Sequence, residues 1–227
     1  EASIEVYYKD FIDLVDYRPA ADLIFTEFIE TELLTGIGRA YGAEFLLRKR
    51  TGKLTGWIGY TLARTERKVT GPTRDLSIND GEWYSANYDR VHDLSIVSNY
   101  SLTKKWDIGA IFAYQTGRPY TPPSAKFEYQ GITAPLYEDR NSQRIPHYHR
   151  LDLSATYTPE SKPGRKYHSS WNFGVYNVYA RKNAYSIFFQ STPQEEGQTS
   201  SSTSDTQAVR LSIFATAIPF VTWNFNF

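Results

Sequence analysis

Hydrophobic and polar residues alternate with a period of two along most of the chain. In the first segment Ile4, Val6 and Tyr8 lie on one face, while Glu5 and Lys9 lie on the other. This period is typical of a β-strand that has one apolar and one polar environment. The same alternation occurs in eight segments, which are residues 2–9, 41–48, 54–62, 93–102, 106–115, 150–157, 171–175 and 209–227.

The last of these segments is the longest, and its alternation continues past Pro219. A proline there predicts a bulge or an irregular stretch, because proline cannot donate to a central β-ladder. The only helix that we expect is a short one within residues 22–34, which lie between Pro19 and Gly36.

The connections between these strands alternate in length. Long connections are expected at about residues 18–36, 68–87, 121–143 and 191–206, and shorter turns at residues 51–53, 103–105 and 159–168. The short turns carry suitable residues, such as Gly52 and the Pro163-Gly164 pair. Long connections on one side and short turns on the other are typical of outer-membrane barrels, whereas a soluble β-sandwich shows no such asymmetry.

Together these two patterns predict an all-β fold, an antiparallel up-and-down transmembrane β-barrel with about eight strands in this chain. Hydrocarbon offers no partner to an unpaired backbone group, so spanning strands must close into a barrel. A strand needs roughly 9 to 11 residues to cross the bilayer, and aromatic residues gather at its interfaces. The aromatic residues near strand ends are Trp57, Tyr60, Tyr88, Tyr100, Trp106, Tyr157, Tyr167, Trp171, Tyr179 and Trp223.

Composition excludes several functional classes. The 227 residues include 25 basic and 25 acidic side chains, and this balance argues against a nucleic-acid partner. There is no Cys, which excludes disulfides and thiolate metal sites, and we expect no cofactor. The absence of Met and of a secretory signal indicates a mature or partial chain. The mean hydropathy of -0.50 does not argue against a membrane, because alternating strands average to a polar value.

The strands and their ends also carry a set of short motifs. They are Gly38-Arg39-Ala40-Tyr41-Gly42-Ala43-Glu44-Phe45, Thr51-Gly52-Lys53-Leu54-Thr55-Gly56-Trp57, Tyr88-Asp89-Arg90-Val91-His92-Asp93-Leu94, Thr116-Gly117-Arg118-Pro119-Tyr120, Tyr148-His149-Arg150-Leu151-Asp152-Leu153 and Asn177-Val178-Tyr179. In combination these motifs resemble the β-barrel of TonB-dependent outer-membrane receptors of the Bacteroidetes type, and the resemblance covers essentially the whole chain. The terminal Phe227 resembles the signal that the barrel-assembly machinery reads.

This resemblance implies a barrel of about 22 strands with a plugged lumen, in the outer membrane of a Gram-negative bacterium. Eight strands are present here, with no visible plug domain or TonB box, so residues 1–227 are expected to be the C-terminal β-barrel segment of a longer receptor. The implied function is active import of a nutrient ligand. The implied partners are outer-membrane lipid, the rest of the receptor with its plug domain, the TonB complex, the barrel-assembly machinery and a SusD-like surface lipoprotein.

Two alternatives stay open. One is a stand-alone eight-stranded outer-membrane barrel with a structural or adhesive role, whose interior would have to be filled by side chains. The residues on its inner face include small ones that suit the wall of a wider barrel, namely Gly42, Gly59, Ser95, Gly109, Ala113, Ser154 and Gly174. The other alternative is a soluble β-rich binding domain, in which the apolar faces pack against each other.

No constellation in the sequence indicates an enzyme. His147 and His149 share a strand face, which would place two imidazoles on one metal, but no third ligand follows at a fixed offset. The charged residues of 89–93 fit a hydrogen-bond network at a barrel mouth better than acid–base chemistry. The glycines fall in strands and turns, outside any phosphate-binding or nucleophile motif.

Substrate contacts are expected from the long connections and from the inner face of the barrel. Aromatic rings there can stack on a sugar, a peptide or a chelate ring, although loop packing is the favoured role for any single one. The candidate ligand-binding residues are Trp83, Tyr84, Tyr120, Phe127, Tyr129 and Tyr137.

Overall fold

The structure is a computed structural model that describes residues 1–19, 21, 26–129, 132–137, 139–160, 168–191, 206–213 and 215–226. For residues 126–129, 132–135, 190, 191, 206 and 226 it describes the backbone only. Within this described part of the chain, no helix has the length and hydrophobicity to cross a membrane.

Long antiparallel strands form one sheet in the order β1-β2-β3-β5-β6-β11-β12-β15, which confirms the predicted up-and-down arrangement. β4 pairs with β3 beside this path and completes a nine-stranded sheet. The bounds are β1 (Ala2–Tyr17), β2 (Leu33–Lys49), β3 (Leu54–Val69), β4 (Tyr84–Ser85), β5 (His92–Ser101), β6 (Trp106–Gln115), β11 (Tyr148–Tyr157), β12 (His168–Tyr176) and β15 (Ile218–Asn226).

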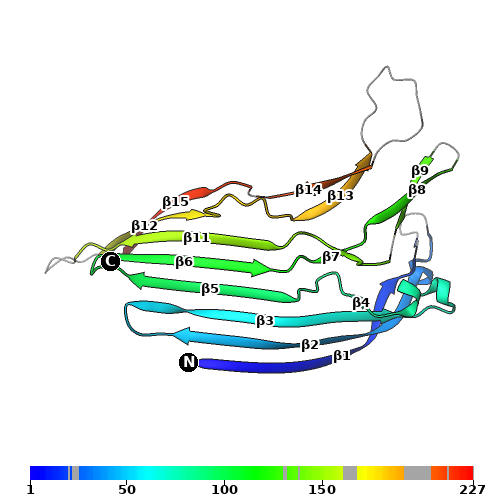
Figure 1. The fold of residues 1–227 in the computed structure, drawn as a ribbon, viewed down its shortest axis with the longest axis horizontal. Helices are drawn as coiled ribbons and strands as arrows, with labels where there is room; N and C mark the ends of the chain where they lie inside the picture. Colours follow the sequence, from blue (N-terminus) through cyan, green and yellow to red (C-terminus); the bar gives the residue numbers. More distant parts are fainter. Residues whose placement is uncertain are drawn as a thin grey trace, which may run out of the picture.

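The smaller elements gather at one end of the sheet, where the long connections lie (Figure 1). They are the ribbons β7 (Pro119–Tyr120) with β10 (Gln143–Arg144), β8 (Pro123–Tyr129) with β9 (Ile132–Tyr137) and β13 (Ser186–Ser191) with β14 (Thr206–Leu211), and the 3-10 helices η1 (Ile29–Glu32), η2 (Arg74–Leu76) and η3 (Ile78–Gly81). The described short turns, at residues 51–53 and 103–105, lie at the opposite end, which confirms the predicted asymmetry of the connections for this part of the chain.

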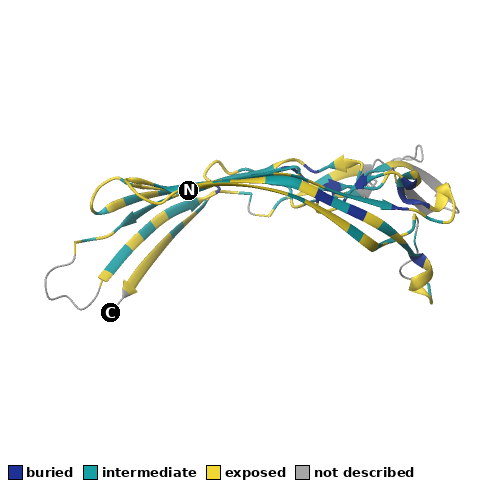
Figure 2. Ribbon diagram, turned by 90° about the horizontal axis from the view of Figure 1, so that it is seen from below, coloured by how far each residue is buried: buried dark blue, intermediate teal, exposed yellow. Residues whose placement is uncertain are grey.

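The sheet is a single curved layer and does not close on itself (Figure 2). β1 lies along one edge and β15 along the other (Figure 1). Among the described residues, β1 pairs only with β2, and β15 pairs only with β12. Each edge therefore presents backbone groups that have no partner strand in the described part of the chain.

One face of the sheet, which we call the apolar face, carries hydrophobic side chains in rows across the strands. Leu47 is opposite Ile58, and Ile58 is opposite Ile96. Phe112 continues the row, since it is opposite both Ile96 and Leu151. Leu47 is 56% exposed and Ile58 is 41% exposed, so this row is not covered by the described residues.

The opposite face, which we call the polar face, carries polar residues at the alternate positions. Glu44 is opposite Glu5 and Thr61, and Asp93 is opposite Thr61 and Gln115. Two carboxylates directly opposite each other repel unless water screens them. The polar face is therefore suited to an aqueous environment.

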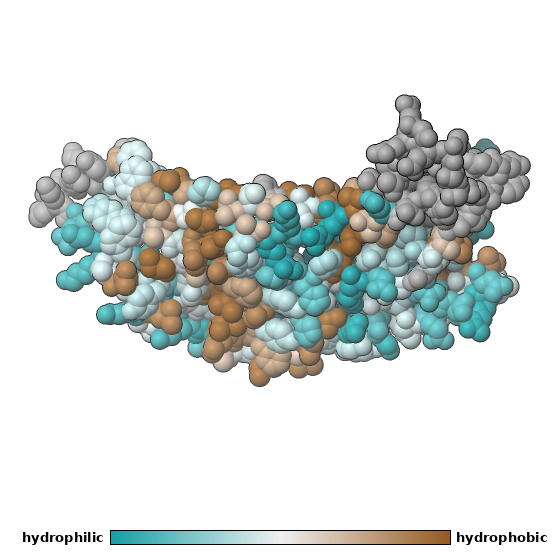
Figure 3. All heavy atoms as spheres, turned by 45° about the horizontal axis from the view of Figure 1, so that its top comes forward, coloured by the Kyte–Doolittle hydropathy of each residue, from teal (hydrophilic) through white to brown (hydrophobic). Residues whose placement is uncertain are grey.

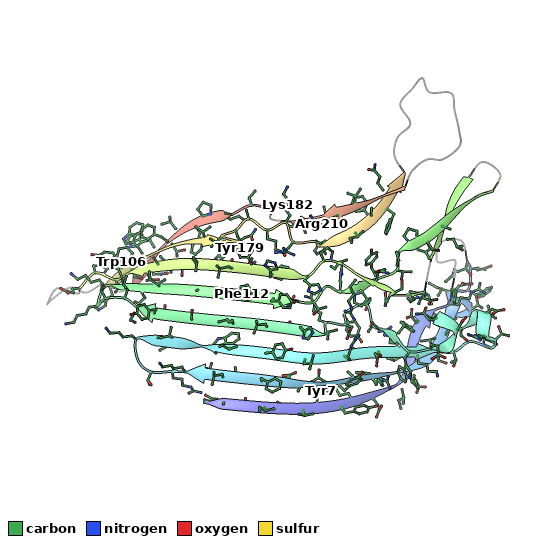
Figure 4. The ribbon with its side chains drawn as sticks, in the orientation of Figure 1. Tyr7, Trp106, Phe112, Tyr179, Lys182 and Arg210 are labelled. Atoms are coloured by element: carbon green, nitrogen blue, oxygen red, sulfur yellow. The ribbon has the colours of Figure 1, made fainter. Side chains whose placement is uncertain are left out.

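A row of aromatic rings borders the apolar face at the end with the short turns. Trp106 is opposite Tyr157, which is opposite Trp171, and Trp171 is opposite Trp223. The rings of Trp106 and Tyr157 have centroids 5.0 Å apart, and those of Trp171 and Trp223 are stacked at 5.8 Å. Figure 4 shows Trp106 at this end of the sheet and Phe112 further along β6. Four residues of the aromatic belt predicted from the sequence form this row. Trp57 lies on the opposite face, beside Glu44 and Thr61, and Tyr167 lies outside the described residues.

Hydrogen-bonded pairs of tyrosine and histidine border the apolar face at its other end. They are Tyr60–His92, Tyr114–His147 and His149–Tyr179, with 2.8, 2.5 and 2.7 Å between the phenol oxygen and Nδ1. Such rings combine an apolar body with a polar tip, which suits a membrane interface.

Beyond this border the apolar face becomes charged. On β3 the residues in phase with Leu54 and Leu62 continue as Arg64 and Glu66, and Glu66 accepts a hydrogen bond of 2.9 Å from Arg39. The nine residues from Leu54 to Leu62 span roughly 26 Å at about 3.3 Å per residue. This length agrees with the apolar band of about 25 Å that outer-membrane barrels present to lipid.

The buried core of the described chain is small and lies beyond the end of the apolar band. It consists of Val69, Ile78 and Tyr84, with Leu34 packed beside them. On the face drawn in Figure 3, hydrophobic residues gather in a band across the strands, and hydrophilic residues prevail toward the end that carries the long connections. The strands thus do not bury their apolar face inside the described chain, as a soluble β-rich domain would.

Two expectations about strands need correction. The long strand expected over residues 209–227 is two strands, because β14 ends at Leu211 and β15 begins at Ile218. β14 pairs with β13 outside the main sheet. Because β14 and β15 continue the same alternation of hydrophobic and polar residues, the sequence pattern does not indicate the break between them. Pro219 lies inside β15 opposite Val175, which an edge strand tolerates because one of its sides has no ladder in the described chain.

The long connections also differ from their expected form. β1 continues to Tyr17 through a register shift between Phe11 and Leu14, and β2 begins at Leu33, so the first connection is shorter than expected. Residues 121–143 contain the β8–β9 hairpin instead of a loop. The helix expected within residues 22–34 is reduced to the single turn η1 in the described residues, which exclude 22–25. The segments 161–167 and 192–205 also lie outside the described residues.

Candidate functional site

Two acidic side chains tie the long connections to the sheet at the end where these connections lie, which we call the wide end. Asp89, which is 1% exposed, accepts a hydrogen bond of 2.6 Å from the Thr65 amide and forms an ion pair with Arg144. Asp16 accepts a hydrogen bond of 2.6 Å from Arg140 and another of 2.9 Å from the Tyr84 hydroxyl. Both arginines come from the segment between β9 and β11, so this segment is held against β1, β3 and β4.

Tyr84 lies beyond the apolar band, in the small buried core. Its side chain is 5% exposed and donates its hydroxyl to the Asp16 carboxylate. Burial, and next the negative charge of Asp16, raise the pKa of the Tyr84 phenol above its ordinary value of 10.0. The neutral phenol is therefore the form that this end of the sheet stabilises.

A cavity of about 680 Å³ lies at the wide end of the sheet, beside β6, β11 and β12. The residues that line it are Arg90, Gln115, Thr116, Gly117, Arg118, Ile145, Pro146, Tyr148, Arg150, Tyr176, Asn177, Asn183, Ala184, Tyr185, Ile213 and Ile218. Gln115, Arg150 and Tyr176 belong to the polar face, since they alternate with apolar-face residues on their strands. The cavity thus opens on the side of the sheet opposite the apolar band, and we call it the arginine cavity.

Each arginine of this cavity is held by polar or aromatic neighbours. Arg90 donates to the side-chain oxygen of Gln115, whose amide donates to Asp93 at 2.8 Å. Arg118 donates to the Tyr185 carbonyl at 2.8 Å, with its guanidinium carbon 5.7 Å from the Tyr185 ring centroid. These contacts fix both side chains at the cavity wall.

The third arginine is partly neutralised. Arg150 forms an ion pair of 2.8 Å with Asp152, and its guanidinium carbon lies 6.0 Å from the Tyr176 ring centroid. Asp152 is 6% exposed and also accepts a hydrogen bond of 2.8 Å from the Asn177 amide. The carboxylate of Asp152 therefore joins β11 to the turn that follows β12.

That turn forms part of the cavity rim. Asn177 has a positive φ of 54°, and its side-chain oxygen accepts a hydrogen bond of 3.0 Å from the Arg181 amide. The Asn183 side chain binds both backbone groups of His149. Its oxygen accepts a hydrogen bond of 3.1 Å from the His149 amide, and its NH2 group donates one of 2.9 Å to the His149 carbonyl. Tyr179 and Lys182 lie on this segment after β12 (Figure 4). The rim is thus cross-linked by side-chain to backbone bonds.

The floor of the cavity depends on a close approach between two chain segments. A Cβ atom on Gly117 would lie 1.7 Å from the carbonyl oxygen of Ile145, which no side chain can occupy. The Ile145 amide donates to the Arg118 carbonyl at 3.1 Å. The Thr116-Gly117-Arg118 motif therefore needs glycine at its centre, and the close approach brings Arg118 to the cavity.

The aromatic residues predicted to bind ligand are dispersed, and the four whose side chains the structure describes, Trp83, Tyr84, Tyr120 and Tyr137, do not line the arginine cavity. Trp83 packs its ring 4.2 Å from the guanidinium carbon of Arg39, and Tyr84 belongs to the core. Tyr120 stacks on Phe189 with centroids 6.3 Å apart, and Tyr137 is 58% exposed.

Three other predicted residues lie outside what the structure describes. The side chains of Phe127 and Tyr129 are among those for which only the backbone is described, and Phe227 is outside the described residues altogether. Their expected roles in ligand binding and in assembly stay predictions.

The two histidines considered as metal ligands each contact a different tyrosine. His147 pairs with Tyr114, while His149 pairs with Tyr179. The described residues contain no group of three or more His, Cys, Asp or Glu side chains placed to hold a metal ion.

The arginines of the cavity were not identified as a site from the sequence. Arg90, Arg118 and Arg150 each stand in one of the motifs quoted above, but in three different segments. Only the pairing of β5 with β6 and of β6 with β11 brings these segments together. The shared presence of arginine in motifs at strand ends was the one signal available.

Comparison with known protein families gives one match. A family model described as TonB dependent receptor-like, beta-barrel matches residues 1–178 of the chain. No curated protein and no solved structure matches. The matched residues include β1 to β12 and therefore every strand of the apolar band except β15.

Proposed function

The chain belongs to the TonB-dependent receptor-like β-barrel family, and we propose that it forms part of the barrel wall and extracellular loops of a receptor that imports a nutrient ligand across the outer membrane. This family consists of outer-membrane transporters and not of enzymes. The observation that carries the proposal is the separation of the sheet into an exposed apolar band and a polar face. The Bacteroidetes type stays a prediction.

The apolar band supports contact with outer-membrane lipid. Its length agrees with the hydrocarbon thickness that such barrels span, and aromatic or Tyr–His rows border it at both ends. The polar face would then line the lumen, and the elements at the wide end would form the extracellular side.

We further propose that these are the C-terminal eight strands of a barrel of about 22 strands with a plug domain in its lumen. The open edges support this proposal, because a spanning strand cannot leave its backbone groups unpaired in hydrocarbon. Further strands would pair with β1 and β15 and close the barrel. Sequencing the coding DNA before the codon for Glu1 tests this: we expect a plug domain and more alternating strands there, and a start codon with a signal peptide directly before Glu1 would contradict it.

The remaining partners follow from the same proposal. The TonB complex would deliver energy through the plug domain, the barrel-assembly machinery would read Phe227, and a SusD-like surface lipoprotein would cover the extracellular side. Two features argue against the alternatives. A stand-alone eight-stranded barrel requires β1 to pair with β15, and a soluble domain requires its apolar face to be buried.

Growth of the source bacterium tests the import function directly. The full-length gene is deleted, and growth is compared over a panel of single carbon, iron and vitamin sources at limiting concentration. We expect a defect on at least one source, the same defect after deletion of the tonB gene, and recovery with the full-length gene. Normal growth on every source, or a defect that does not depend on TonB, would contradict the proposed function.

A further inference from the structure

We propose that the arginine cavity binds a small oxyanion, a carboxylate- or phosphate-bearing molecule, during import. This proposal rests on the proposed function, which places the polar face of the sheet in the lumen. Nothing else described above assigns a ligand or a ligand class to this cavity.

The charge balance of the cavity is the first argument. Three arginines line it, and no Asp or Glu is among the described lining residues. Among the described residues, Arg150 is the only one of the three that forms an ion pair, with Asp152. The described contacts of Arg90 and Arg118 are to a side-chain amide oxygen and a backbone carbonyl, so their positive charges are not neutralised there.

The chemistry of the guanidinium group is the second argument. Its planar fork matches the geometry of a carboxylate or a phosphate, and bonds between two charged groups are stronger than bonds between neutral ones. Because Arg90 and Arg118 use backbone or amide oxygens as neighbours, they keep further N–H donors for an anion. An oxyanion would supply the missing negative charge.

The size and lining of the cavity are the third argument. Its volume of about 680 Å³ lies within the range of roughly 300 to 1,000 Å³ that small-molecule sites occupy. Tyr148, Tyr176 and Tyr185 add ring surface beside the arginines, and Ile213 and Ile218 add apolar surface. The ligand therefore combines the oxyanion with a ring or an apolar portion.

The rigidity of the wall is the fourth argument. The close approach of Gly117 to Ile145 and the bonds of Asn177 and Asn183 hold the cavity in its shape without a ligand. A binding site that is formed beforehand loses less entropy when the ligand binds.

Chemical labelling of the purified full-length receptor in detergent tests the proposal. Phenylglyoxal modifies accessible guanidinium groups, and mass spectrometry of peptides measures the rate at each arginine. We expect Arg90 and Arg118 to react without added anion and to be protected about tenfold by saturating citrate or pyrophosphate, but not by sucrose. Arg74, which is exposed on η2, should react at the same rate throughout and serves as the control.

The two anions distinguish the two ligand chemistries. Stronger protection by citrate assigns a carboxylate ligand, and stronger protection by pyrophosphate assigns a phosphate ligand. Equal rates with and without either anion would overturn the proposal. The proposal would also be overturned if Arg90 and Arg118 did not react in the absence of anion, since another part of the receptor would then fill the cavity.

Variants add a second measurement. Arg90→Gln and Arg118→Gln should each weaken binding of the protecting anion about tenfold, because each removes one charged hydrogen bond, whereas Arg74→Gln should not. Unchanged binding in both cavity variants would overturn the proposal. Labelling needs neither TonB nor uptake: protection without TonB-dependent growth would contradict only the import function, and TonB-dependent growth without protection would contradict only the anion site.

Discussion

The indole rings of Trp171 and Trp223 stack across β12 and β15, with centroids 5.8 Å apart and 20° between their planes. They are direct cross-strand partners at the border of the apolar band. Trp171 is 41% exposed and Trp223 is 56% exposed, so a large part of each ring faces the surroundings of the sheet. In a bilayer interface these exposed ring faces contact lipid, while the stacked faces join β12 to the edge strand β15 of the main sheet.

We predict that Trp171→Ala and Trp223→Ala are coupled in their effect on stability. Aromatic pairs contribute about 0.5 to 1.5 kcal/mol beyond the area that they bury, so the double variant should lose less than the sum of the two single variants by about this amount. Urea unfolding of the full-length receptor in lipid vesicles, followed by gel mobility of unheated samples, measures the three losses. Strictly additive losses would show that the stacking does not stabilise the barrel.

The buried carboxylate of Asp89 gives a prediction about the wide end of the sheet. Asp89→Asn leaves Arg144 without its ion pair, and breaking a buried pair costs about 3 to 5 kcal/mol. We expect lower stability and faster tryptic cleavage between β6 and β11. The control is Asp80→Asn, whose partner Arg74 is 75% exposed, and this pair should contribute less than about 1 kcal/mol. Equal cleavage rates in the two variants would contradict the role assigned to Asp89.

The phenol of Tyr84 gives a prediction about alkaline pH. Its pKa is raised in the folded chain, so the stability that it contributes is fully present below the unfolded pKa of about 10 and decreases as the pH rises above it. Tyr84→Phe should therefore reduce stability at neutral pH through the lost hydrogen bond to Asp16, and the difference from the wild type should shrink above pH 10. Unfolding midpoints between pH 7 and pH 12 measure this. A difference that stays constant over that range would contradict the assigned burial.

Adjacent residues of β5 allow a matched test of the two faces. Ile96 lies in the apolar row and Ser95 lies on the polar face opposite Gly59 and Ala113. Arginine at position 96 should cost about 2 to 4 kcal/mol near the bilayer midplane, whereas arginine at position 95 should cost much less. The folded fraction of Ile96→Arg and Ser95→Arg in outer membranes, read from gel mobility, measures both. Equal losses in the two variants would argue against the assigned faces.

Most of the main sheet could be predicted from the sequence, because its strands alternate wherever one face meets hydrocarbon. β6 begins at Trp106 and ends at Gln115, as expected. Beyond the apolar band both faces meet water, so the alternation disappears although the strand continues, and β3 therefore extends past Leu62 to Val69. The same reason explains why the β8–β9 ribbon was not predicted, whereas residues 209–211 of β14 were predicted as the start of the last strand.

The arginine cavity could not be predicted because its residues are distant in the sequence. Arg118 precedes β7, while Arg150 lies on β11, and only the strand register makes them neighbours of one cavity. The aromatic candidates for ligand binding lie in or beside the long connections. Tyr84 is one of them and belongs to the buried core, so an aromatic residue of a connection can serve packing instead of ligand binding.

Nitroxide scanning of β5 tests the central claim most directly. The chain contains no Cys, so single cysteines at positions 93 to 100 can carry the label once any cysteine elsewhere in the full-length receptor is replaced. In vesicles, collision rates with oxygen report hydrocarbon, and those with a water-soluble nickel complex report water. We predict oxygen maxima at positions 94, 96, 98 and 100 and none at the positions between them. Collision rates with oxygen that do not alternate, or that peak at positions 93, 95, 97 and 99, would contradict the account.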